Sequence, residues 1–209
     1  MVHLLYPRRD FLGSIRRQDD VLAILRKLHA HHPETYQHSC RVAYLGVDIA
    51  MDLNPTEDDL CLLTRAGYLH DTGKLGESVD LLDAKRNLDL YEREEMHLHA
   101  FWTIFLLTQK GYDPEMVSLA GAHHEWQLDA YPRKTASPRE EPPFIGNRRI
   151  ESQRHRTLSQ ILALADHVDA LAAKRAYKDP FPPETIERIL YEDFTGDKSL
   201  IPLAMKRVS

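Results

Sequence analysis

The feature that most constrains the fold is a series of histidine and aspartate side chains spread over five segments, each with helical periodicity. Glu34 and His38 are four residues apart, so a helix would put them on one face. Where a helical pattern ends, as at His70-Asp71, the second side chain can turn toward the same point as the first. The full set of donors in chain order is Glu34, His38, His70, Asp71, His99, His123, His124 and Asp166. We therefore expect an all-α bundle whose metal ligands come from five helices.

Apolar periodicity and capping residues predict the helices themselves. The clearest start signal is Thr56 with Asp59, a capping box, and Pro33 and Pro114 are typical of a first helical turn. Residues 1–18 look irregular or weakly helical, 129–156 look like a long loop, and the last dozen residues carry no clear pattern. The expected helices cover about 19–31, 34–51, 57–70, 92–108, 114–123, 159–174 and 183–191.

Composition limits the classes of function. The net charge of -5 gives no overall basic field, so we expect no long nucleic acid as a partner. The chain shows neither a signal peptide nor the run of about 20 apolar residues that a membrane helix needs. Cys40 and Cys61 lie in helix-like segments and are interpreted as reduced thiols, so we expect a cytoplasmic location; a single disulfide between them is the alternative.

The donor set also indicates the kind of metal. Imidazole and carboxylate together suit Fe, Mn, Zn or Ni better than Ca or Mg, and Fe or Mn are the ions we favour. Asp71 could bridge two ions. His29, His31 and His32 precede Pro33 and are expected at an exposed helix end.

The order of these motifs resembles the HD superfamily of metal-dependent phosphohydrolases, and more closely its HD-GYP branch, which hydrolyses cyclic di-GMP. The resemblance runs from about Pro33 to Lys178, and it implies that Glu34, one turn before His38, could hold a third ion. It rests on His38-Ser39-Cys40-Arg41-Val42, His70-Asp71-Thr72-Gly73-Lys74-Leu75-Gly76, Met96-His97-Leu98-His99, His123-His124-Glu125, the segment Leu164–Leu171, and Arg175-Ala176-Tyr177. On this resemblance, 33–180 is the catalytic domain, 1–32 an N-terminal helical arm, and 181–209 a C-terminal helical extension packed on the same domain.

The sequence departs from the family at its Gly-Tyr-Pro motif. After Glu125 it continues Trp126-Gln127-Leu128-Asp129-Ala130-Tyr131-Pro132, which is shorter and lacks both glycines. The change puts the identity of the substrate in doubt and leaves the metal motifs untouched.

The resemblance implies a mechanism in which a hydroxide bridging two metals attacks phosphorus. Lys74 would stabilise the charge on the phosphate oxygens, and Asp169 would orient a ligand or accept a proton. A salt bridge between Asp169 and Arg175 is the alternative interpretation. Tyr131, Arg175 and Tyr177 are expected to contact the nucleotide.

The leading hypothesis is a phosphodiesterase acting on a cyclic dinucleotide such as cyclic di-GMP. A nucleotidase or other phosphomonoesterase is a second reading, and a nucleotide-binding protein without turnover is a third. An oxygenase built on the same metal scaffold is a fourth. The sequence leaves open a homodimer, the count of two or three ions, and the role of the loop 133–156.

Overall fold

The computed structural model describes residues 8–128, 130, 152–173 and 180–208. These residues form helices and turns, and their one β-type contact is an isolated bridge between Gln127 and Phe194. The all-α prediction is therefore confirmed. The helices are α1 Arg8–Arg16, α2 Asp19–His31, α3 Pro33–Ala50, η1 Met51–Leu53, α4 Glu57–Leu69, η2 Thr72–Gly76, α5 Val79–Leu82, α6 Leu90–Gln109, α7 Pro114–Gly121, α8 Gln153–Ala172, α9 Pro183–Asp193, η3 Lys198–Leu200 and α10 Ile201–Met205.

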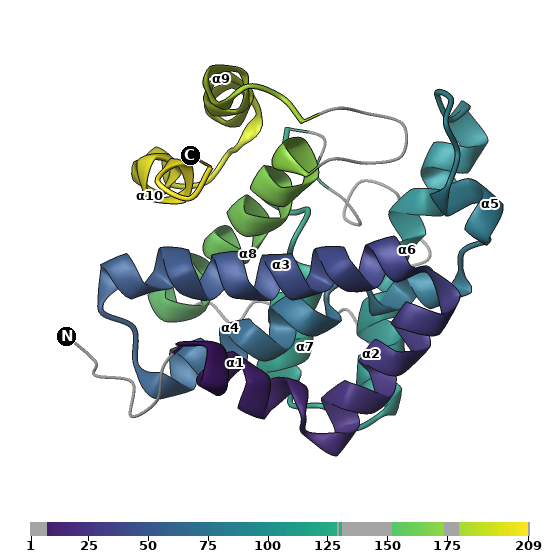
Figure 1. Cartoon of the computed structure of the whole chain (residues 1–209), viewed down its shortest axis with the longest axis horizontal. Helices are drawn as coiled ribbons and strands as arrows, with labels where there is room; N and C mark the ends of the chain where they lie inside the picture. Colours follow the sequence, from purple (N-terminus) through teal and green to yellow (C-terminus); the bar gives the residue numbers. More distant parts are fainter. Residues whose placement is uncertain (1–7, 129, 131–151, 174–179, 209) are drawn as a thin grey trace.

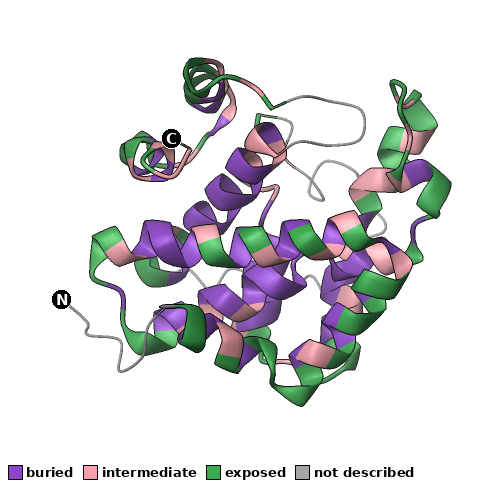
Figure 2. Ribbon diagram, in the orientation of Figure 1, coloured by how far each residue is buried: buried purple, intermediate pink, exposed green. Residues whose placement is uncertain are grey.

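Helix α3 crosses the middle of the molecule and packs against both α4 and α8 (Figure 1). Its buried side includes Val42 and Val47, and the matching faces of the neighbouring helices are also buried (Figure 2). The close approach of α4 depends on Gly67, because a Cβ built there would lie 2.6 Å from the Cα of Ala43. This contact fixes how near the end of α4 comes to α3, and the end of α4 carries His70.

The expected capping box at the start of α4 is present. The Thr56 side chain accepts a hydrogen bond from the backbone N–H of Asp59, and the Asp59 carboxylate accepts one from the N–H of Thr56. A second box, formed by Asp89 and Glu92, starts α6. These local signals set the first turns of two helices that carry site residues.

Two segments are more regular than their sequence pattern suggested. The N-terminal residues form helix α1, whose Phe11, Leu12 and Ile15 are buried in the common core. Helix α8 begins at Gln153, six residues before the expected Ser159, because the Ser152 side chain caps it by accepting from the N–H of His155. In both cases tertiary burial selects a helix in a segment with weak periodicity of its own.

The C-terminal residues, which had no predicted structure, form η3 and α10 beside α9 (Figure 1). Ile186, Leu190 and Ile201 belong to the same apolar cluster as α1 and α3. An ion pair between Arg207 and Asp48 ties this end to α3. The division into arm, domain and extension stays a prediction, although all three parts contribute to one core. Among the helices described, none has both the length and the apolar character needed to cross a membrane.

Candidate metal centre

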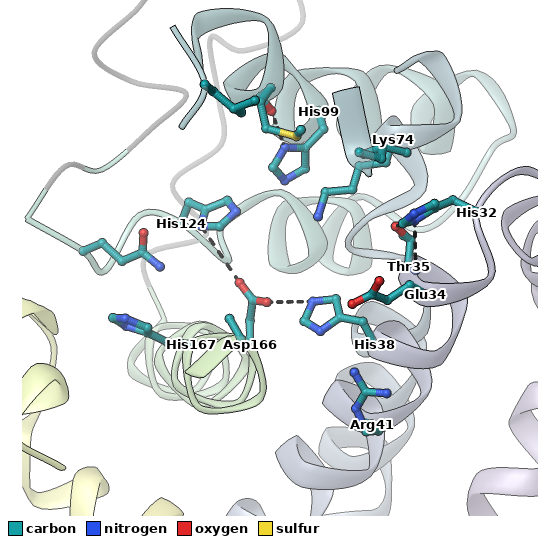
Figure 3. Close-up of a pocket in the computed structure, with 15 residues that line it drawn as sticks. His32, Glu34, Thr35, His38, Arg41, Lys74, His99, His124, Asp166 and His167 are labelled. Carbon is teal, nitrogen blue, oxygen red and sulfur yellow. Dashed lines mark hydrogen bonds and ion pairs between the residues drawn. The ribbon is translucent and has the colours of Figure 1, made fainter. Parts of the chain in front are cut away.

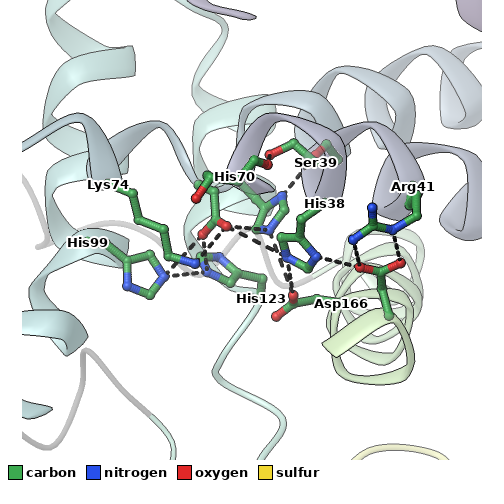
Figure 4. A network of polar contacts seen from close by, with 12 residues as sticks. His38, Ser39, Arg41, His70, Lys74, His99, His123 and Asp166 are labelled. Carbon is green, nitrogen blue, oxygen red and sulfur yellow. Dashed lines mark hydrogen bonds and ion pairs between the residues drawn. The ribbon is translucent and has the colours of Figure 1, made fainter. Parts of the chain in front are cut away.

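The carboxylate of Asp71 lies between two pairs of the predicted histidines. Figure 4 shows these histidines, His38, His70, His99 and His123, gathered in one network of polar contacts. Oδ2 of Asp71 is 3.6 Å from Nε2 of His38 and 3.5 Å from Nε2 of His70. Its Oδ1 faces the other way, 3.4 Å from Nε2 of His99 and 4.0 Å from Nε2 of His123. The two oxygens of one carboxylate thus face two different pairs of histidines.

The turn that carries Asp71 is held against α6. His70 is the C-cap of α4, and Asp71 starts the 3-10 turn η2. The Thr103 hydroxyl, on α6, donates to the carbonyl of His70 at 2.7 Å and accepts from the N–H of Gly73 at 2.8 Å. Gly73 packs so closely on the carbonyl of His99 that a Cβ at this position would overlap it. This clamp sets the position of His99 relative to Asp71.

Three of the histidines are oriented by the backbone in the same way. The Nδ1–H groups of His70, His99 and His123 donate to the carbonyls of Gly67, Met96 and Ala120, at 2.9, 2.6 and 2.7 Å respectively. A carbonyl oxygen only accepts, so each Nδ1 carries the proton and each Nε2 presents a lone pair. Ring orientation of this kind is typical of histidines that bind metal.

His38 is oriented by side chains instead. Its Nδ1 is 2.7 Å from Oδ2 of Asp169, and its Nε2 is 2.9 Å from Oδ1 of Asp166. Arg41, one turn along α3, donates to both oxygens of Asp169, at 2.7 and 3.0 Å. The carboxylate of Asp169 is therefore paired with Arg41, whereas Arg175, the partner considered from sequence, lies outside the described residues.

The pKa values separate the histidines into two kinds. Burial, and then the charge of Lys74, lowers the pKa of His99 to about 3, and burial followed by His70 lowers that of His123 to about 4. Burial also acts to lower the pKa of His38, but hydrogen bonds to Asp166 and Asp169 raise it to about 9. The pKa of Asp71 is held well below its usual range, because Lys74 and His70 outweigh the effect of burial.

The geometry fits metal ions better than a structural network. The Nε2 atoms of His99 and His123 are 3.0 Å apart although both present lone pairs, which is the spacing of adjacent ligands on an ion with metal–nitrogen bonds of about 2.1 Å. Nε2 of His70 is buried without a hydrogen-bond partner, an arrangement that is costly unless a cation binds there. The groups able to hold an ion here are His99–His123–His124, His38–His70–Asp71 and His70–His123–Asp166.

A cavity of about 300 Å³ opens beside these groups (Figure 3). Lys74 lines it with Nζ 2.7 Å from Oδ2 of Asp71, and Glu34 lines it from the first turn of α3. His124 and Asp166 face each other at 3.9 Å across one side of it. All the predicted metal residues except His70, Asp71 and His123, which lie deeper, thus line this cavity.

Some expectations are corrected or lie beyond the described residues. His32, expected at an exposed helix end, is buried and caps α3 by accepting from the N–H of Thr35. Arg41 also lines the cavity and was not singled out, although its spacing of three from His38 puts both on one face of α3. Tyr131, Arg175 and Tyr177 lie outside the described residues and stay predictions.

The chain is similar in sequence to known phosphodiesterases. The chain is 33% identical over 175 residues to the 3'3'-cGAMP-specific phosphodiesterase 3 of Vibrio cholerae, covering 83% of this chain and 35% of the relative. It is 32% identical over 171 residues to the cyclic di-GMP phosphodiesterase of Thermotoga maritima, covering 79% of this chain and 42% of that one. The chain therefore spans about a third of the length of the first of these relatives.

The fold is also found among solved structures. The HD domain of the L. monocytogenes phosphodiesterase PgpH, solved in complex with cyclic-di-AMP, superposes with a TM-score of 0.58 at 18% identity, covering 89% of this chain and 93% of that one. The sequence model of the HD domain matches residues 35–171, which include every predicted donor except Glu34. With the matching span covering most of the chain and its fold and donors in place, the chain belongs to the HD domain family.

Proposed function

We propose that this chain is a metal-dependent phosphodiesterase that hydrolyses a cyclic dinucleotide such as cyclic di-GMP. The observation that carries the proposal is the position of Asp71, whose two oxygens face two separate pairs of histidines. One carboxylate placed in this way can bridge two ions. The relatives named above, which act on 3'3'-cGAMP and cyclic di-GMP by their names, support the class of substrate.

The ligands proposed for the two ions divide at Asp71. His38 and His70 face Oδ2, and we assign Asp166 to the same ion because its Oδ1 is 2.9 Å from Nε2 of His38. His99 and His123 face Oδ1, and we assign His124 to that ion because the three imidazoles form one group of donors. Mixed imidazole and carboxylate ligands favour Fe or Mn, with Zn or Ni also compatible. When bound, such ions lower the pKa of water and neutralise phosphate oxygens, which is the chemistry that phosphodiester hydrolysis requires.

The protein's own residues supply position and charge. Lys74 reaches into the cavity from η2, where its ammonium can contact a non-bridging phosphate oxygen and stabilise the charge that develops there. Asp169 holds His38 through Nδ1 and thereby aims Nε2 at the proposed ion. Asp169 is itself fixed by Arg41, so we assign it a positioning role.

The cavity suits an anionic substrate with flat bases. Arg41 and Lys74 contribute positive charge, while Leu82, Leu88 and Met96 form an apolar wall. Charged contacts would hold phosphate, and the apolar wall would contact a base or sugar. Both cysteines are free, in keeping with the cytoplasmic location proposed for the enzyme.

The test is turnover by anaerobically purified protein supplied with Fe²⁺ or Mn²⁺. Cyclic di-GMP, 3'3'-cGAMP and cyclic di-AMP would be compared in parallel, with products separated by chromatography. A linear dinucleotide or mononucleotide product is expected with at least one of them. Metal-loaded protein that hydrolyses none of the three, but releases phosphate from nucleoside monophosphates, would replace the proposal with a phosphomonoesterase.

Asp71→Asn provides the matched variant. It keeps the shape of the side chain but removes the charge and one of the two oxygens that would hold the ions, so metal content and turnover should fall together. Asp58→Asn, an exposed change on α4, should leave both unchanged. An Asp71→Asn protein that keeps its ions and its rate would contradict the assignment of this carboxylate.

A further inference from the structure

The segment that follows the paired histidines is held by the C-terminal part of the chain. The backbone N–H of Thr195 donates to the carbonyl of Trp126 at 2.9 Å. The backbone N–H of Leu128 donates to Oδ1 of Asp193 at 3.2 Å. Gln127, between these two hydrogen bonds, forms the isolated bridge described above. The backbone of Gln127 is therefore fixed by residues beyond 171, where the match to the HD domain ends.

Gln127 and His167 both line the cavity of the metal centre. Asp193 places them at the same end of it, because its Oδ2 is 3.7 Å from Nδ1 of His167 while its Oδ1 accepts from the segment that carries Gln127. Figure 3 shows His167 beside Asp166, on the side of the cavity away from Lys74. Neither Gln127 nor His167 has a role in the function proposed above.

Charge distinguishes this end of the cavity from the rest. The described residues that line it, Gln127, His167 and Ala170, include no lysine or arginine, and Figure 3 shows Arg41 and Lys74 away from His167. A phosphate is attracted by cations, whereas the edge of a base offers neutral donors and acceptors that an amide can match. The proposed metal ions and Lys74 therefore suit a phosphate, and the end with Gln127 suits a base.

We propose that Gln127 recognises the edge of one purine base of the substrate, and that Asp193 positions it. The inference rests on the proposed function, since it names a specificity-determining residue for the same class of substrate. An amide presents a donor and an acceptor side by side. Adenine offers the matching pair at N6–H and N7, and guanine offers it at N1–H and O6.

The anchoring of this segment favours selective recognition. The indole N–H of Trp126 donates to the hydroxyl oxygen of Ser159 at 3.0 Å, and the guanidinium of Arg156 lies 5.4 Å from the centre of the indole ring. The residue before Gln127 is thus fixed to α8 as well as to the C-terminal part of the chain. A recognition group discriminates between bases only when its supporting contacts prevent it from moving to suit the wrong one.

The experiment compares Gln127→Glu with the unaltered protein on cyclic di-GMP and cyclic di-AMP. A carboxylate presents two acceptors, which match N1–H and N2–H of guanine but no edge of adenine. The ratio of kcat/KM for the two substrates should therefore shift toward cyclic di-GMP by about tenfold or more. The added negative charge weakens both substrates alike and cancels in the ratio. The ratio of the two dissociation constants, measured by calorimetry on metal-loaded protein, should shift in the same direction.

A second pair of variants tests the positioning role. Asp193→Ala removes the acceptor of the Leu128 N–H. In that background Gln127→Glu should shift the ratio by a smaller factor than it does alone, because the segment is held less firmly. Glu192→Gln, an exposed change beside Asp193 on α9, is the control and should leave the full shift in place. An equal shift in the Asp193→Ala background would remove Asp193 from the proposal.

Failure of the proposed function gives a different result. Dinucleotide binding whose ratio shifts in Gln127→Glu, without turnover of any cyclic dinucleotide, would reject hydrolysis and keep base recognition. Turnover with a ratio that Gln127→Glu leaves unchanged would keep the phosphodiesterase and overturn the role of Gln127. Metal-loaded protein that binds neither dinucleotide would overturn both.

Discussion

The ring of His38 donates a hydrogen bond of 2.7 Å from Nδ1 to Oδ2 of Asp169, a residue 131 positions later in the chain. The same carboxylate accepts two hydrogen bonds from Arg41. It is 7% exposed, and its pKa is lowered because the hydrogen bonds from His38 and Arg41 outweigh the effect of burial. The orientation of one proposed ligand therefore depends on a charged side chain from another helix.

Asp169→Asn should weaken metal binding without unfolding the protein. The amide is a poorer acceptor than the carboxylate, so Nε2 of His38 is less well oriented and less basic, and affinity should fall by about 10- to 100-fold. Competition with a chelator measures the change, and Glu187→Gln on the exposed side of α9 is the control. An unchanged dissociation constant would show that His38 needs no such partner.

Metal binding should release one proton from His38 near neutral pH. The pKa of His38 is raised to about 9, so in metal-free protein the ring is charged below that pH and the ion must displace a proton. Affinity should rise by about tenfold per pH unit up to about pH 9 and then level off. His99 and His123, with pKa values of about 3 and 4, are already neutral at pH 7 and therefore release no proton when metal binds.

Calorimetry in two buffers of different ionisation enthalpy measures that release. The unaltered protein should release about one proton from this residue at pH 7.5, and Asp169→Asn should release less because it removes one cause of the raised pKa. Binding without any proton release would mean that His38 is neutral in the metal-free protein.

Lys74→Met should keep the ions and slow turnover. The ammonium is 2.7 Å from Asp71 but is not a metal ligand, so its loss removes positive charge from the phosphate-binding side. We expect kcat to fall by about 10²- to 10³-fold with a smaller change in KM. Equal turnover with equal metal content would remove Lys74 from the reaction.

Gly67→Ala should destabilise the fold by about 1–3 kcal/mol through overpacking of α4 on α3. The added Cβ would come 2.6 Å from the Cα of Ala43, a backbone atom that cannot move away alone. Gly76→Ala is the matched control, since a Cβ there meets no atom within 4 Å. Denaturant unfolding compares the two, and equal midpoints would mean that the helices separate at little cost.

Sequence patterns within a few residues of each other correctly predicted where helices begin and which of their faces are buried. The capping box at Thr56, the proline start of α3 and the apolar stripe through Leu60 and Leu63 all appear as expected. The convergence of donors could be inferred because helical spacing limits where each side chain points. The sequence does not reveal which oxygen of Asp71 faces which histidine, because that depends on how the helices pack.

What the sequence did not predict comes from distant partners. His32 is buried, and its Nε2 lies 3.2 Å from Oδ1 of Asp83, 51 residues later; no pattern near Pro33 reveals that contact. Helix α1 is stabilised by burial of its apolar side chains in the common core, and its apolar pattern is too short to predict a helix by itself. Arg41 is a different case. Its spacing of three residues from His38 can be read from the sequence, whereas its ion pair with Asp169 cannot.

The carbonyls that orient His70, His99 and His123 have a consequence for how this centre can change over evolution. Every residue carries a backbone carbonyl, so replacement of the side chain at Gly67, Met96 or Ala120 does not delete the acceptor. His38 alone among these four depends on a side chain that a single codon change can alter. Substitutions at Asp169 could therefore change the metal affinity on the His38 side in small steps. The orientations of the other three rings would change only if the helices that carry the carbonyls changed.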